Sequence, residues 1–182
     1  MMEEIFDVVN ENDEVIGRAT RKEVHEKGLP HRAVVLFFVK GENLILQRRS
    51  QRVAASKGAL GVSVGGHVLQ GEDYIDALIR ECKEETGLAI QAQNLRELGR
   101  FYSNHRGAYG DVDHLAFHKI YVHEFNGEIN QLMPDKEEVI AYEEVPVAKV
   151  FSPDFENEKY SLALTDEQLV RALKKYYEEK NV

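Results

Sequence analysis

The sequence predicts a layered α/β (α+β) protein. Its 182 residues suit one domain with a sizeable core, which we take as residues 1–182. Segments rich in β-branched and aromatic residues alternate with segments whose apolar residues recur at helical spacing. No internal repeat, low-complexity tract or Pro/Gly/Ser-rich linker separates them. Alternating strands and helices agree with a sheet covered by helices.

The N-terminal half supplies two expected strand pairs and a short helix. Strands at 5–9 and 15–19 form a hairpin within residues 3–20, because the turn between them reads Asn-Glu-Asn-Asp. Thr20 caps a helix over 21–26, which Gly28 and Pro30 end. A fully buried strand is expected at 33–39, followed by a turn and a strand at 44–47.

The C-terminal half supplies two further strands and a terminal helix. Strands are expected at 95–102 and 115–125, separated by a polar loop. Tyr102, Tyr109 and His105 are candidates for stacking on a base, and packing in the core or at its rim is the alternative. A helix over 165–180 starts at a Thr165-x-x-Gln168 capping box, and its apolar stripe packs on the core or forms a homodimer interface.

Composition excludes several classes of protein. The hydrophobic fraction of 43% and the charged fraction of 30% are those of a soluble globular protein. A net charge of −9 without a basic patch argues against binding to nucleic acid. The single cysteine excludes an intramolecular disulfide and fits a reducing compartment. With no visible signal peptide and no apolar run that could cross a membrane, we expect a cytoplasmic protein.

The segment 66–88 concentrates negative charge on one face of a helix. A helix over 73–86 places Glu81, Glu84 and Glu85 at positions i, i+3 and i+4, beside a separate apolar stripe. Carboxylates this close repel one another unless a cation lies among them. Periodicity alone allows a solvated acidic face, and the alternative is a site for Mg²⁺ or Mn²⁺, which prefer oxygen ligands.

The full spacing of this segment resembles the Nudix box. Gly66, Glu72 and the run from Arg80 to Leu88 occupy the fixed positions of that motif, and Cys82 replaces an aliphatic residue. The resemblance implies the Nudix fold, a mixed β-sheet sandwiched between helices, and a metal-dependent hydrolase that cleaves diphosphates linked to another moiety.

The resemblance also implies roles for individual residues. Glu81, Glu84 and Glu85 would hold Mg²⁺ or Mn²⁺ together with the backbone of Gly65 or Gly66. Arg80 would orient the glutamates by ion pairing, and Glu72 would support the loop or a further metal. The general base would be Glu81, or Glu137 or Glu138 from a later acidic loop; a charged turn before an edge strand is the alternative reading of that loop. We name Glu81, Glu85 and Glu138 as the candidate catalytic residues.

The N-terminal segment resembles the branch of the Nudix superfamily that includes isopentenyl diphosphate isomerase. In those isomerases, three histidines and two acidic residues form a second metal site. His25, His31 and His67, with Asp111 and Asp113, stand in the corresponding places. The isomerases use a cysteine immediately before the glycine that starts the box, where this chain has Gly65. Because glycine has no side-chain proton to transfer, isomerase chemistry is disfavoured.

A basic cluster lies between the second strand pair and the box. Arg48, Arg49 and Arg52 are candidate phosphate ligands, since arginine forms bidentate bonds to phosphate. At most one of Arg48 and Arg49 faces the site, because neighbouring strand residues point to opposite sides. An exposed, solubilising loop is the alternative. Three functions therefore remain: a diphosphate hydrolase of small molecules, an isomerase, and a non-catalytic diphosphate-binding module.

Overall fold

A computed structural model describes the chain except for residues 1–2, 54–55, 106–113, 135, 153–159 and 181–182. The N-terminal part has β1 (Ile5–Val9), β2 (Val15–Thr20), α1 (Arg21–Lys27), β3 (His31–Lys40), β4 (Asn43–Arg49), β5 (Val64–His67) and α2 (Tyr74–Thr86). The C-terminal part has η1 (Ala92–Asn94), β6 (Arg96–His105), β7 (His114–Glu124), η2 (Ile129–Gln131), β8 (Val139–Pro146), α3 (Val147–Val150), α4 (Leu162–Thr165) and α5 (Glu167–Lys180). The expected hairpin, helix α2 and buried strand are confirmed.

The main sheet is mixed, as the fold class predicts. Its strands lie in the order β6-β7-β3-β4-β8, and β5 pairs with the first half of β3. The pairing of β3 with β7 is parallel and the other pairings are antiparallel. Because β4 pairs with β3 only at residues 38–40, the two strands diverge beyond the turn and leave room for β5.

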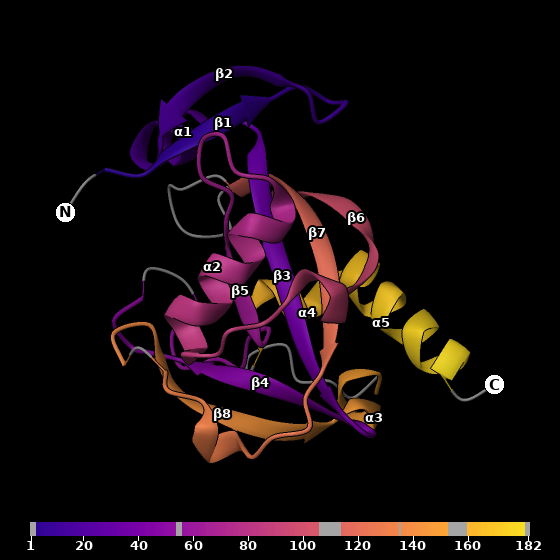
Figure 1. Ribbon diagram of the computed structural model, residues 1–182. Coiled ribbons are helices and arrows are strands. Elements are labelled where there is room, and N and C mark those ends of the chain that lie inside the picture. Colours follow the sequence, from indigo (N-terminus) through magenta and orange to yellow (C-terminus); the bar gives the residue numbers. More distant parts are fainter. Residues whose placement is uncertain (1–2, 54–55, 106–113, 135, 153–159, 181–182) are drawn as a thin grey trace.

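Both faces of the sheet are covered by helices. Alternate residues of β3 point to opposite sides: Val35, Phe37 and Val39 join one core, and Val34, Leu36 and Phe38 join the other. Helix α5 packs on the first core and α2 on the second, so the sheet lies between them (Figure 1). The apolar stripe of α5 is buried within the chain itself, which is the core packing we expected from its pattern.

Helix α5 begins later than the sequence indicated. Thr165 ends the short helix α4, and α5 starts at Glu167. The backbone N–H groups of Gln168 and Leu169 donate to the side chain of Asp166, at 2.9 and 3.3 Å. Asp166 therefore caps the helix in place of Thr165, because its carboxylate is a strong acceptor for these unpaired amides.

The β1–β2 hairpin and α1 form an N-terminal unit, residues 5–27, which is held to the sheet through a buried aspartate. Asp13, in the hairpin turn, has a φ of 66° and is 9% exposed. Its carboxylate accepts hydrogen bonds from Arg32 Nε (2.6 Å), Arg100 Nη1 (2.6 Å) and the Tyr74 hydroxyl (2.9 Å). Since these partners belong to β3, β6 and α2, one side chain ties the unit to three elements of the core.

Candidate active site

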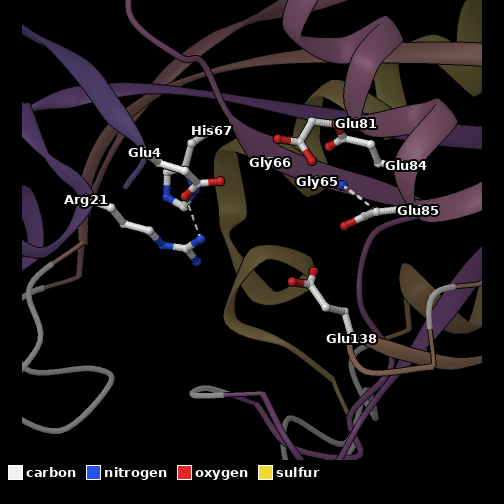
Figure 2. A pocket seen from close by; sticks show the side chains of 9 residues that line it. All are labelled: Glu4, Arg21, Gly65, Gly66, His67, Glu81, Glu84, Glu85 and Glu138. Carbon is white, nitrogen blue, oxygen red and sulfur yellow. Dashed lines mark hydrogen bonds and ion pairs between the residues drawn. The ribbon is translucent and has the colours of Figure 1, made fainter. Parts of the chain in front are cut away.

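A pocket lies between α2, β5 and the N-terminal unit. It is lined by Glu4, Arg21, Gly65, Gly66, His67, Glu81, Glu84, Glu85 and Glu138. Figure 2 shows the box glutamates and Glu138 on one side, with Arg21 and Glu4 on the other. The helix therefore presents its acidic face to a concave site rather than to open solvent.

Two of the box glutamates are substantially buried. Glu85 is 8% exposed and accepts a hydrogen bond from the Gly65 N–H at 3.3 Å. Burial raises the pKa of Glu85 well above its usual value, and neighbouring Glu81 raises it further. Burial also raises the pKa of Glu81 to about 7, against the opposing effect of Arg80. A cation among these carboxylates would stabilise their charged forms.

Arg80 links the parts of the box. Its Nε and Nη2 donate to the two carboxylate oxygens of Glu72 at 2.8 and 2.9 Å. Its Nη1 donates to Glu81 (2.8 Å) and Glu84 (3.2 Å). Its Nη2 also reaches the carbonyl oxygen of His67, at 2.9 Å. These contacts fix the glutamates relative to strand β5, the arrangement that the resemblance implied for Arg80.

Strand β5 approaches α2 too closely for a side chain at position 66. A Cβ atom on Gly66 would lie 2.0 Å from Cδ and 2.2 Å from Oε1 of Glu81. The glycine therefore lets the backbone of the strand lie directly against the Glu81 carboxylate.

The two candidate bases of the later loop have different surroundings. Glu138 lines the pocket and raises the pKa of Glu85 by its charge. Glu137 is 66% exposed at its side chain and pairs with Arg52. Of the pair, Glu138 is thus the glutamate that the fold brings to the box.

The predicted arginines lie outside the lining of the pocket. Arg48 donates to both carboxylate oxygens of Glu143, at 2.7 and 2.9 Å, and to the carbonyl oxygen of Gly58. The charge of Arg49 lowers the pKa of Glu85, so this arginine acts electrostatically on the box. None of Arg48, Arg49 and Arg52 is among the pocket-lining residues. Their contact with phosphate stays a prediction.

Arg21 is a pocket residue that sequence reasoning did not select. It appeared in the sequence only as the first residue of an expected helix, and no motif marked it. The fold places it opposite the glutamates (Figure 2), because α1 lies beside the end of β5, where the ring centroids of His25 and His67 are 5.4 Å apart.

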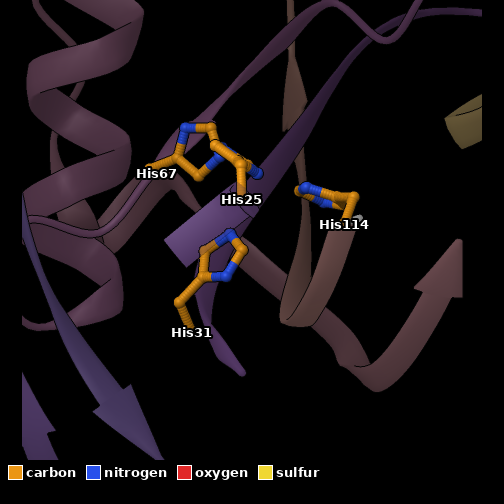
Figure 3. Close-up of side chains that lie close together, drawn as sticks. All are labelled: His25, His31, His67 and His114. Atoms are coloured by element: carbon orange, nitrogen blue, oxygen red, sulfur yellow. The ribbon is translucent and has the colours of Figure 1, made fainter. Parts of the chain in front are cut away.

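Four histidines meet beside the pocket. One ligand atom from each of His25, His31, His67 and His114 lies within 4.8 Å of the others, and Figure 3 shows the rings converging. They come from α1, β3, β5 and β7. His114 was not predicted, since its place depends on the pairing of β7 with β3. Asp111 and Asp113, the acidic residues expected here, lie outside the described residues.

The imidazoles are suited to bind a metal. Burial lowers the pKa of His31 to about 4 and that of His67 well below its ordinary value, so both rings are neutral. Nδ1 of His31 lies 3.0 Å from the carbonyl oxygen of Leu29 and must carry the proton, which leaves Nε2 as an acceptor. Among the described residues, Nε2 of His31 and of His67 is buried without a hydrogen-bond partner. Such nitrogens are ligands for a transition-metal ion.

Comparisons with known proteins agree with this geometry. The sequence pattern of the NUDIX domain matches residues 29–165. An uncharacterized Nudix hydrolase of Clostridium acetobutylicum is 32% identical over 152 residues, which cover 81% of this chain and 72% of that protein. An isopentenyl-diphosphate Delta-isomerase of Serratia proteamaculans is 30% identical over 128 residues, 70% of this chain and 69% of that enzyme.

A protein from Deinococcus radiodurans, known from a crystal structure, has a similar fold. That protein is 27% identical, with a TM-score of 0.73, and the match covers 92% of this chain and 98% of the other. Within the described part of the chain, no helix combines the length and apolar character required to cross a membrane. The box geometry, the domain match and the relatives together lead to one conclusion: the chain belongs to the Nudix hydrolase family.

Proposed function

We propose that this protein hydrolyses the diphosphate linkage of a small molecule, with a divalent metal ion held by the Nudix box. The observation that carries the proposal is the convergence of Glu81, Glu84, Glu85 and Glu138 on one pocket. Burying Glu81 and Glu85 beside two further carboxylates is unfavourable without a compensating cation.

The donor set fits Mg²⁺ or Mn²⁺. Glu81, Glu84 and Glu85 offer carboxylate oxygens, and the absence of a side chain on Gly66 lets the backbone of β5 lie against Glu81. When bound, such an ion supplies positive charge to the diphosphate and acidifies water. Glu85, which is buried and accepts a hydrogen bond from the Gly65 N–H, is the residue that we assign as the direct ligand.

The chain's own residues provide proton transfer and orientation. Glu138 takes the proton of the attacking water, and Glu81 is the second candidate base. Arg80 keeps Glu81 and Glu84 directed into the pocket. Arg49 is the member of the basic cluster that we assign to phosphate contact, because the adjacent Arg48 is directed to Glu143 and neighbouring strand residues point to opposite sides.

We assign the four histidines to a second metal site of different chemistry. Neutral imidazoles favour ions such as Zn²⁺, Co²⁺ or Ni²⁺ over Mg²⁺. Asp111 and Asp113 stay candidates for additional ligands. An ion there would join the N-terminal unit, through His25, to strands β3, β5 and β7.

The isomerase and binding-module functions receive less support. Gly65 lines the pocket where the isomerases carry their cysteine, and the chain's one cysteine, Cys82, is buried in the apolar core behind α2. Burial raises the pKa of Cys82 to about 11, which suits packing rather than proton transfer. The complete set of box glutamates favours catalysis over binding alone.

The test is a panel of diphosphate compounds incubated with purified protein and Mg²⁺ or Mn²⁺. The panel includes nucleoside diphosphates, nucleotide sugars, dinucleotides and isopentenyl diphosphate, with phosphate release measured with and without added phosphatase. Glu85→Gln is expected to abolish turnover, whereas Glu178→Gln, which removes an exposed carboxylate on α5, leaves it unchanged. Absence of hydrolysis, with conversion of isopentenyl diphosphate to its allylic isomer, would replace the hydrolase by the isomerase.

A further inference from the structure

The last turn of α2 receives one of its hydrogen bonds from a side chain of β8. An α-helix leaves its final carbonyl oxygens without partners inside the helix. At the end of α2, the Gly87 N–H donates to the carbonyl oxygen of Lys83 at 2.9 Å. The Tyr142 hydroxyl donates to the carbonyl oxygen of Glu85 at 3.3 Å. The residue that we assign as the direct metal ligand is therefore held through its backbone by a different element of the fold.

A β-bulge in β8 directs Tyr142 toward α2. The pairing of β8 with β4 shifts between Val139 and Ala141, which leaves Ile140 as an extra residue. In a regular strand, Val139 and Tyr142 would face opposite sides of the sheet, because they are three positions apart. Here both belong to the core beneath α2, and the side chain of Ile140 is 50% exposed. The extra residue thus re-aims the tyrosine, as bulges do.

Glu85 is fixed at both its side chain and its backbone. Its carboxylate accepts a hydrogen bond from the Gly65 N–H of β5 at 3.3 Å, and its carbonyl oxygen accepts one from Tyr142. Burial raises the pKa of the Tyr142 hydroxyl above its ordinary value, so the hydroxyl keeps its proton and stays a donor. The candidate base is anchored separately, since the carbonyl oxygen of Glu138 accepts from the Ser50 N–H at 2.8 Å.

Tyr142 joins the support of the metal ligand to that of the base. Glu85 and Glu138 both line the pocket, and Figure 2 shows their carboxylates directed into the same space. They come from different elements, because Glu85 belongs to α2 and Glu138 directly precedes β8. We propose that Tyr142 is a positioning residue, whose hydroxyl holds Glu85 at the separation from Glu138 that hydrolysis requires. The inference rests on the proposed hydrolase function and adds to it a contact that fixes the geometry of the site.

Binding of Mn²⁺ tests the assignment without turnover. The electron paramagnetic resonance signal of free Mn²⁺ gives a Kd for each variant, and Glu85→Gln identifies the part of the binding that belongs to the box. Tyr142→Phe removes one oxygen atom and keeps the ring that packs in the core. We expect its Kd for Mn²⁺ at the box to rise by about three- to tenfold, because the backbone of the metal ligand loses a neutral hydrogen bond.

Tyr177→Phe is the matched control. The Tyr177 hydroxyl donates to the carbonyl oxygen of Asn43 at 3.4 Å, so the same kind of contact is lost in the core on the other face of the sheet. Each variant should lower the Tm by about 2–4 °C, and only Tyr142→Phe should weaken Mn²⁺ binding. Equal weakening in both variants, or a rise in Kd of less than about threefold in Tyr142→Phe, overturns the assignment.

Steady-state kinetics on the substrate found in the panel provide a second readout. At saturating Mn²⁺, Tyr142→Phe should lower kcat by about tenfold and leave KM within about twofold, because the substrate contacts are kept while the metal ligand and the base are displaced from one another. A raised KM with unchanged kcat would contradict a positioning role. Weaker Mn²⁺ binding in Tyr142→Phe alone supports the inference even if no compound of the panel is turned over, and unchanged Mn²⁺ binding overturns it even if hydrolysis is observed.

Discussion

Replacing Gly66 by alanine places a methyl group in the space of the Glu81 carboxylate. The new Cβ would lie 2.0 Å from Cδ of Glu81, whereas ordinary contact begins at 3.4 Å. The carboxyl group must therefore move by about 1.4 Å, the difference between these distances. Misplacing an active-site group by 1 Å lowers the rate by about 100-fold, so we expect kcat/KM to fall by at least that factor.

The same substitution should have a smaller effect on stability. Glu81 is the flexible end of a side chain, and its movement removes one charged hydrogen bond, that from Arg80 Nη1 at 2.8 Å. We expect the free energy of unfolding to fall by about 2 kcal/mol. The loss of activity therefore exceeds what partial unfolding explains.

Initial rates at saturating Mg²⁺, measured beside urea unfolding curves, provide the assay. Gly17→Ala is the control, because no atom lies within 4 Å of the position its Cβ would take. A Gly66→Ala enzyme with kcat/KM within threefold of the wild type would refute the reasoning that β5 sets the position of Glu81.

Three further predictions concern the hairpin, the histidines and the base. Asp13→Asn should lower the free energy of unfolding by about 3 kcal/mol, because it leaves Arg32 without its buried counter-charge. If the free energy of unfolding falls by ~2 kcal/mol per molar urea, the midpoint of urea unfolding moves down by about 1.5 M. An unchanged midpoint would contradict the role of Asp13 in holding the N-terminal unit to the sheet. Zn²⁺ or Co²⁺ should raise the Tm of the metal-free wild type and leave that of His114→Ala nearly unchanged; an equal rise in both would exclude His114 as a ligand. Glu138→Gln should lower kcat by about 100-fold or more while Glu137→Gln keeps it, and the reverse order would assign the base to Glu137.

The box could be recognised in the sequence because its chemistry is local. Glu81, Glu84 and Glu85 share a face through helical periodicity alone, and Asp73 and Gly87 cap that helix in the structure as their residue types predict. The buried strand β3 could also be predicted from the sequence, since a short continuous run of apolar residues is typical of a strand buried on both faces.

The choice between neighbouring residues depended on contacts distant in sequence. The sequence does not tell which of the adjacent residues Glu137 and Glu138 faces the site. Only the path of the chain into β8 directs Glu138 to the pocket. Arg48 and Arg49 are equal candidates for a phosphate contact in the sequence, and only the pairing of β4 with β8 brings Arg48 against Glu143.

By itself, the sequence determined the Nudix box, the helix that carries it and the alternation of strands and helices, because each can be read from one continuous stretch of the chain. Only the tertiary structure brought Arg21 to the pocket and His114 to the other three histidines. Those placements follow from the parallel pairing of β7 with β3 and from the docking of the N-terminal unit. The strand pairing and the docking each bring together residues that are far apart along the chain, and local sequence patterns do not predict such contacts.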